Sequence, residues 1–106
     1  MFESEKRCLE ICGLIKEDSE LDNHDKILYS LLYLVKNRFP LKKINNYFVE
    51  NGDEEEFFRQ FKLAEDSGMI RNVIDSDEFL ERQYIYTPDS LPQVNGKLLI
   101  YEKMVD

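Results

Sequence analysis

Hydrophobic residues recur every three to four positions over much of the chain, which is the spacing of amphipathic α-helices. The pattern predicts a first helix over residues 3–16 and a second over residues 22–39, with Asp22 or Asn23 as the N-cap of the second. The second helix is apolar on most sides, as its members show: Ile27, Leu28, Leu31, Leu32, Leu34, Val35 and Phe39. A helix of this kind is contacted from several sides, so we expect it at the centre of the fold.

Two further helices follow, separated by a tight turn. The first is predicted over residues 40–51, where a proline opens the helix and Gly52 supplies the left-handed residue that ends it. The second is predicted over residues 53–67, and Asp53 with Glu56 has the spacing of a capping box at its start. Two helices joined by about three residues that include glycine form a helix-turn-helix arrangement.

After the fourth helix the pattern changes to β-branched and aromatic residues with a polar turn between them. This change predicts a β-hairpin over about residues 69–87. Residues 97–104 are compatible with a third strand or with a terminal helix, and the sequence leaves both open. The predicted fold class is mainly α with a small β-hairpin or three-stranded sheet, in a single domain over residues 1–106.

The order of helix, short helix, glycine turn, helix and hairpin resembles the winged-helix family of helix-turn-helix domains. The best-matching residues run from Lys26 to Thr87. Within them, LAEDSGMIRNV (63–73) resembles the end of that family's third helix running into its first wing strand, and YIYT (84–87) resembles the returning strand. The resemblance implies a scaffold that serves either DNA reading or protein docking. It also implies that the helix over 53–67 would be the DNA-reading helix.

The charge of the chain argues against DNA reading by that helix. The 106 residues include 22 acids and 14 bases, a formal net charge of −8. Glu54 and Glu55 fall in the first turn of the helix, and Asp77 and Glu78 fall in the hairpin tip. Carboxylates there repel phosphates, which DNA-binding proteins neutralise with Lys and Arg. We therefore predict that these four acids contact a basic protein partner, although acids also suit a helix N-terminus and a charge run is commonly a solvated face.

One basic corner lies at the junction of the second and third predicted helices, within a stretch that contains no acid. Its members are Lys36, Arg38, Lys42 and Lys43. A solvated corner is the simpler interpretation, and a contact with phosphate or with an acidic partner is the functional one. Four charges are few for tight nucleic-acid binding by a chain of this net charge, so we expect little of it. The corner nevertheless defines the alternative function, a DNA-binding regulator.

Neither enzyme chemistry nor a cofactor is indicated. The sequence has one histidine, His24, and no glycine-rich phosphate loop or metalloprotease motif. Cys8 and Cys12 share one face of the first helix, where they are best explained as small apolar core residues. A metal site would lack further ligands, and a Cys–His nucleophile pair would need His24 to reach one of the thiols. We predict no catalytic residues, no metal and no cofactor.

The N-terminal residues lack the apolar run of a secretory signal, and no apolar stretch is long enough to span a membrane. We therefore expect a cytoplasmic protein that does not bind membranes. The sequence favours a non-enzymatic, acidic regulator or inhibitor on a winged-helix scaffold, which acts by binding a basic or nucleic-acid-binding protein. It does not indicate an oligomeric state.

Overall fold

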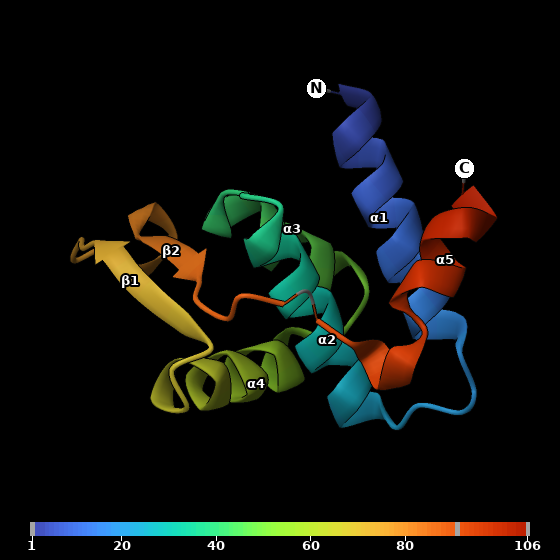
Figure 1. The fold of residues 1–106 in the computed structure, drawn as a ribbon. Coiled ribbons are helices and arrows are strands. Elements are labelled where there is room, and N and C mark those ends of the chain that lie inside the picture. Colours follow the sequence, from blue (N-terminus) through green and yellow to red (C-terminus); the bar gives the residue numbers. More distant parts are fainter. Residues whose placement is uncertain (1, 91, 106) are drawn as a thin grey trace.

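The computed structural model describes residues 2–90 and 92–105, with side chains described from Glu5 onwards. The described chain is mainly helical and has one small antiparallel sheet, as predicted (Figure 1). Its helices are α1 (Phe2–Glu17), α2 (Asn23–Lys36), α3 (Leu41–Glu50), α4 (Glu54–Asp66) and α5 (Leu98–Val105). Its strands are β1 (Ile70–Ile74) and β2 (Gln83–Tyr86), with short 3-10 turns at Phe79–Glu81 and Val94–Gly96.

α2 is the central element, because it packs against α1, α3, α4 and β2. Its buried residues lie on most of its circumference: Ile27, Ser30, Leu31, Leu32, Tyr33, Leu34 and Val35. Asp22 caps it, and its carboxylate accepts a hydrogen bond of 2.9 Å from the Asp25 amide. Of the apolar residues predicted for this helix, Leu28 and Phe39 are only partly buried and lie at the edge of the core.

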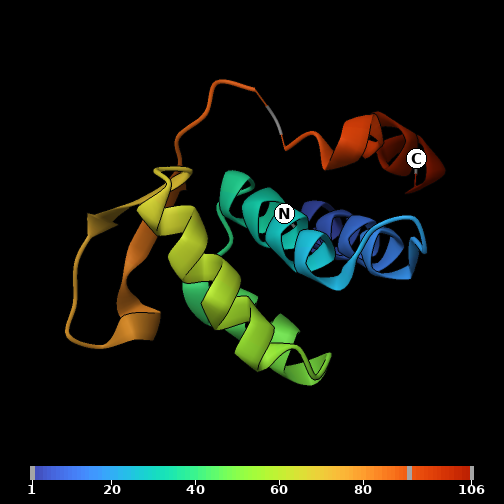
Figure 2. The same cartoon turned by 90° about the horizontal axis from the view of Figure 1, so that it is seen from below.

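The elements fall into two halves on either side of α2. α1 and α5 lie side by side in one half, and the hairpin lies beside α4 in the other (Figure 1, Figure 2). Aromatic rings join the elements of the second half: Phe48 of α3 stacks on Phe57 of α4, and Phe61 of α4 meets Tyr84 of β2 at a centroid distance of 4.8 Å. This half contains the residues that the sequence predicted as functional.

The C-terminal segment is a helix, and the sheet of the described residues has two strands. Leu98 and Tyr101 of α5 are buried, in the half of the core that α1 and α5 share. Lys97 and Tyr101 also reach the loop that follows α1. Lys97 binds Asp18 at 3.0 Å and Glu20 at 2.7 Å, and the Tyr101 hydroxyl donates to Asp18. These contacts are distant in sequence, which is why the local pattern left strand and helix open.

Three helices end in the same way, and one of them uses an unexpected residue. α2 was predicted to continue to Phe39 but ends at Lys36, because Arg38 adopts a left-handed conformation with φ 63°. Gly52 and Gly68 occupy the corresponding positions after α3 and α4, with φ of 75° and 80°. The amide that follows then bonds back into the helix, as a Schellman motif requires. The three bonds join Phe39 to Leu34, Asp53 to Phe48 and Met69 to Ala64, at 3.0, 2.8 and 2.9 Å.

The predicted capping box at the start of α4 is wrong. Asp53 is the N-cap residue, but its side chain makes no capping hydrogen bond, and its carboxylate lies 3.9 Å from the Lys16 ammonium. The Asp53 amide is already bonded to the carbonyl of Phe48, so it is not available to Glu56. The turn between α3 and α4 is too short to provide separate residues for ending one helix and capping the next.

Candidate functional site

The acidic surface predicted from the sequence lies on two neighbouring elements. Glu54 and Glu55 are exposed in the first turn of α4, and Asp77 and Glu78 are exposed in the hairpin tip. The tip leans on α4 through Phe79, whose ring lies 5.7 Å from the ring of Phe58 and 5.2 Å from that of Phe61. The two pairs of acids therefore flank one aromatic contact. We call Glu54, Glu55, Asp77 and Glu78 the acidic surface.

The exposed side of α4 carries little available positive charge. Arg59 is one of the two bases on this helix, and it pairs with Glu55 at 3.6 Å and with Glu56 at 2.7 Å. Lys62, the other base, forms no ion pair with a described residue. Two large apolar side chains are exposed on the same helix, Phe58 at 42% and Leu63 at 53%. Acids interleaved with apolar groups suit a protein contact, whereas a polyanion requires bases.

Glu56 belongs to an internal network and not to the acidic surface. Its carboxylate accepts a hydrogen bond of 2.8 Å from the side chain of Gln60, and it lies 3.1 Å from His24 of α2. The Gln60 amide first, and then His24 and Arg59, lower the pKa of Glu56 below its ordinary value. The network links α4 to α2, and local sequence patterns missed it because His24 and Glu56 are distant in sequence.

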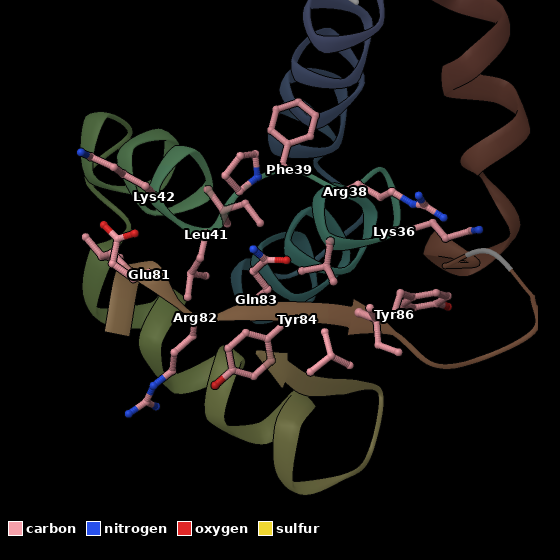
Figure 3. A pocket seen from close by; sticks show the side chains of 16 residues that line it. Lys36, Arg38, Phe39, Leu41, Lys42, Glu81, Arg82, Gln83, Tyr84 and Tyr86 are labelled. Carbon is pink, nitrogen blue, oxygen red and sulfur yellow. The ribbon is translucent and has the colours of Figure 1, made fainter. Parts of the chain in front are cut away.

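The basic corner lines a groove between the α2–α3 junction and β2 (Figure 3). Lys36, Arg38 and Lys42 lie along the groove, are exposed, and form no ion pair with a described residue. Lys43 is the exception, because it pairs with Glu5 of α1 at 2.5 Å. The structure therefore brings three of the four predicted bases to one groove, and the fourth forms an ion pair with α1.

The groove has a volume of about 880 Å³, and much of its lining is apolar or aromatic. Phe39 and Leu41 lie on the helical side, and Tyr84 and Tyr86 lie on the side of the hairpin (Figure 3). Leu80 of the hairpin also lines the groove. The sequence patterns identified the bases but not this groove, because its two walls are about forty residues apart in the chain. Its combination of an apolar lining with unpaired cations can hold a ligand that is both apolar and anionic.

The two cysteines are buried and unreactive in character. Cys12 is 0% exposed, and burial raises the pKa of its thiol to about 12. Burial also raises the pKa of Cys8, so neither thiol is ionised at neutral pH. The Cys12 thiol donates to the carbonyl of Ser30, whereas His24 lies 3.1 Å from Glu56. Within the described residues, no three side chains of the metal-binding types are grouped so that they could hold an ion.

No protein family, curated protein or solved structure matches this chain. The winged-helix resemblance thus remains a prediction from residues 26–87, and the functional argument depends on the two surfaces described above. None of the helices in the described residues is long and apolar enough to cross a membrane.

Proposed function

We propose that this protein is a non-enzymatic regulator or inhibitor on a winged-helix scaffold that acts in the cytoplasm by binding a basic protein. The acidic surface, Glu54, Glu55, Asp77 and Glu78, is the proposed contact. Its partner is a protein with a basic surface, a class that includes nucleic-acid-binding proteins. Charges of this kind accelerate association and select the partner more than they add affinity.

One observation carries the proposal: the exposed side of α4 is acidic and apolar at the position where a winged-helix DNA reader needs bases. Arg59 is already neutralised by Glu55 and Glu56, so the helix offers a polyanion little attraction. Phe58 and Leu63 of the same helix are exposed and supply apolar area, as the centre of a protein interface requires.

The second candidate function is DNA binding through the basic corner. The observation that favours it is the exposure of Lys36, Arg38 and Lys42 without ion-pair partners among the described residues. The apolar lining between them and the net charge of −8 weigh against it, since phosphate binding needs a continuous basic surface.

A pair of binding assays tests these two functions. The first probe is a fluorescent amphipathic peptide of lysine and leucine, which represents a basic protein surface. The second is a random-sequence DNA duplex. We expect the peptide to bind, with an affinity that falls as salt rises from about 0.01 M to about 0.15 M. We expect negligible retardation of the duplex at the higher salt. Micromolar DNA binding with a steep salt slope would overturn the protein-binding proposal.

Charge reversal locates the contact. The double variant Glu54→Lys/Asp77→Lys changes one acid on each element of the acidic surface. Glu17→Lys/Asp89→Lys is its matched control, because it makes the same change in net charge at two exposed acids elsewhere, one in α1 and one in the segment after β2. We expect the first variant to slow association with the peptide about tenfold at low salt, and the control to slow it much less. Equal effects would show that only net charge matters and that the acidic surface is a solvated face.

A further inference from the structure

β2 has one edge that no described strand covers. It pairs with β1 alone, antiparallel, so its other edge is free. The amide of Thr87 donates to the carbonyl of Met69, which marks a bonded pair of the ladder. Bonded pairs recur at every second residue of an antiparallel ladder, so the amide and carbonyl of Ile85 face β1. The backbone amides and carbonyls of Tyr84 and Tyr86 consequently point to the free edge.

This free edge borders the groove of the basic corner. Residues of β2 form one wall of the groove, and residues 36–42 form the other (Figure 3). No backbone hydrogen bond connects these two walls in the described chain. Edges of this kind readily accept an added strand, and proteins normally cover or blunt them. Here the edge opens into an apolar groove of about 880 Å³.

The charge along the groove specifies the occupant. Lys36 and Arg38 lie toward one end of the opposite wall, and Lys42 lies toward the other (Figure 3). Arg38 is held there in a left-handed conformation that glycine would adopt without strain. Two charged residues of the hairpin also line the groove: Glu81, which is an acid, and Arg82, which pairs with Asp75 (Figure 3). Cations therefore outnumber acids in the lining, and Lys36, Arg38 and Lys42 form no ion pair with a described residue. This excess of positive charge is complementary to acids and not to bases. The apolar lining requires apolar side chains as well.

We propose that the groove binds an extended, acidic segment of a partner protein, which adds to the free edge of β2 as a third strand. Its backbone pairs with the amides and carbonyls of Tyr84 and Tyr86. Because side chains alternate along a strand, the apolar ones enter the groove while the acidic ones reach Lys36, Arg38 and Lys42. β2 has four residues, so the bound segment needs about four to six residues in alternation.

This binding site is independent of the acidic surface, and it recognises a partner of opposite charge. A nucleic acid is the less suitable occupant. It offers no backbone that can pair with a strand edge, and three cations neutralise few of its phosphates. A peptide can pair with the strand edge through its backbone, fill the apolar lining with its apolar side chains and bind the cations with its acids.

A labelled peptide tests the proposal. The probe is a fluorescent peptide of alternating glutamate and valine, about seven residues long. The control peptide replaces each glutamate with lysine. We expect the acidic peptide to bind and the basic one not to. Hydrogen exchange of the β2 amides is the second measurement. It reports backbone pairing, which electrostatic attraction alone would not produce. At saturation the amides of Tyr84 and Tyr86 should gain protection of about tenfold or more, while that of Ile85 changes little because it is already bonded to β1.

Matched variants identify the cations. Lys36→Glu/Lys42→Glu removes two of them from the groove, and Lys62→Glu/Lys103→Glu makes the same change in net charge at exposed lysines on α4 and α5. We expect the first variant to weaken peptide binding about tenfold and the second much less. Arg38→Gly should also weaken binding while the fold is retained, since glycine suits this backbone conformation.

Several results would overturn the proposal. These are no binding of the acidic peptide, equal binding of the basic peptide, or binding without protection of Tyr84 and Tyr86. Displacement of the bound peptide by a DNA duplex would instead assign the groove to nucleic acid. Glu54→Lys/Asp77→Lys should leave peptide binding nearly unchanged, so failure at the groove and failure at the acidic surface are separate outcomes.

Discussion

Arg38 ends α2 in the left-handed conformation that glycine supplies at the corresponding positions after α3 and α4. L-residues pay roughly 1–2 kcal/mol for left-handed backbone, and glycine does not, although glycine loses more entropy on folding. Arg38→Gly should therefore raise the free energy of unfolding by about 0.5–1 kcal/mol, as measured by urea denaturation.

Gly68→Arg is the converse control, because it places arginine at the equivalent position after α4. A Cβ at Gly68 would meet nothing within 4 Å, so only the backbone conformation opposes the change. We expect this variant to lower the free energy of unfolding by a similar amount. An Arg38→Gly variant less stable than the wild type would show that the arginine side chain supports the fold as well as the groove.

At the scale of elements, α5 is held by a small polar cluster next to the loop after α1. The hydrogen bond from Tyr101, with those from the Glu20 amide and Lys97, lowers the pKa of Asp18 from 3.8 to about 2. A carboxyl whose pKa is lowered in the folded state stabilises that state above its ordinary pKa. This stabilisation is lost as the pH falls from about 4 toward 2, so acid should loosen α5.

Asp18→Asn tests this expectation, because asparagine keeps an oxygen for Tyr101 but has no charge to titrate. Between about pH 6 and about pH 3, the wild type should lose more thermal stability than the variant. Glu17→Gln is the matched control at an exposed neighbour and should behave like the wild type. If the wild type and Asp18→Asn lose stability equally, Asp18 does not link α5 to the fold at neutral pH.

At the scale of the whole molecule, one core joins both halves. Leu31 of α2 is 0% exposed and Phe61 of α4 is 4% exposed, and both belong to the same buried cluster. Leu31→Ala or Phe61→Ala should each lower the free energy of unfolding by about 2–5 kcal/mol. Helix content and tertiary near-ultraviolet signal should be lost in one transition. Separate transitions would indicate that the two halves unfold independently.

Much of this architecture could be predicted from the sequence. Helical periodicity located α1 to α4, and β-branched runs located the hairpin, because each signal comes from neighbouring residues. The apolar run before Tyr101 has no clear period, so α5 stayed open until its contacts with α1 and Asp18 were known. The four acids of the acidic surface were identified from the sequence, and the structure places all four at exposed positions. The groove beside Lys36, Arg38 and Lys42 was not, because only the folded chain brings β2 next to them.

The two buried thiols allow the opening of α1 to be measured by alkylation. Cys8 and Cys12 lie where α1 meets α2, and only a thiolate reacts quickly with alkylating agents. With Cys12 fully enclosed and its pKa raised to about 12, a reagent must wait until α1 leaves the core. Each alkylated molecule in a mass spectrum therefore records one such opening. The natural chain reports how often its N-terminal helix detaches, without any introduced label.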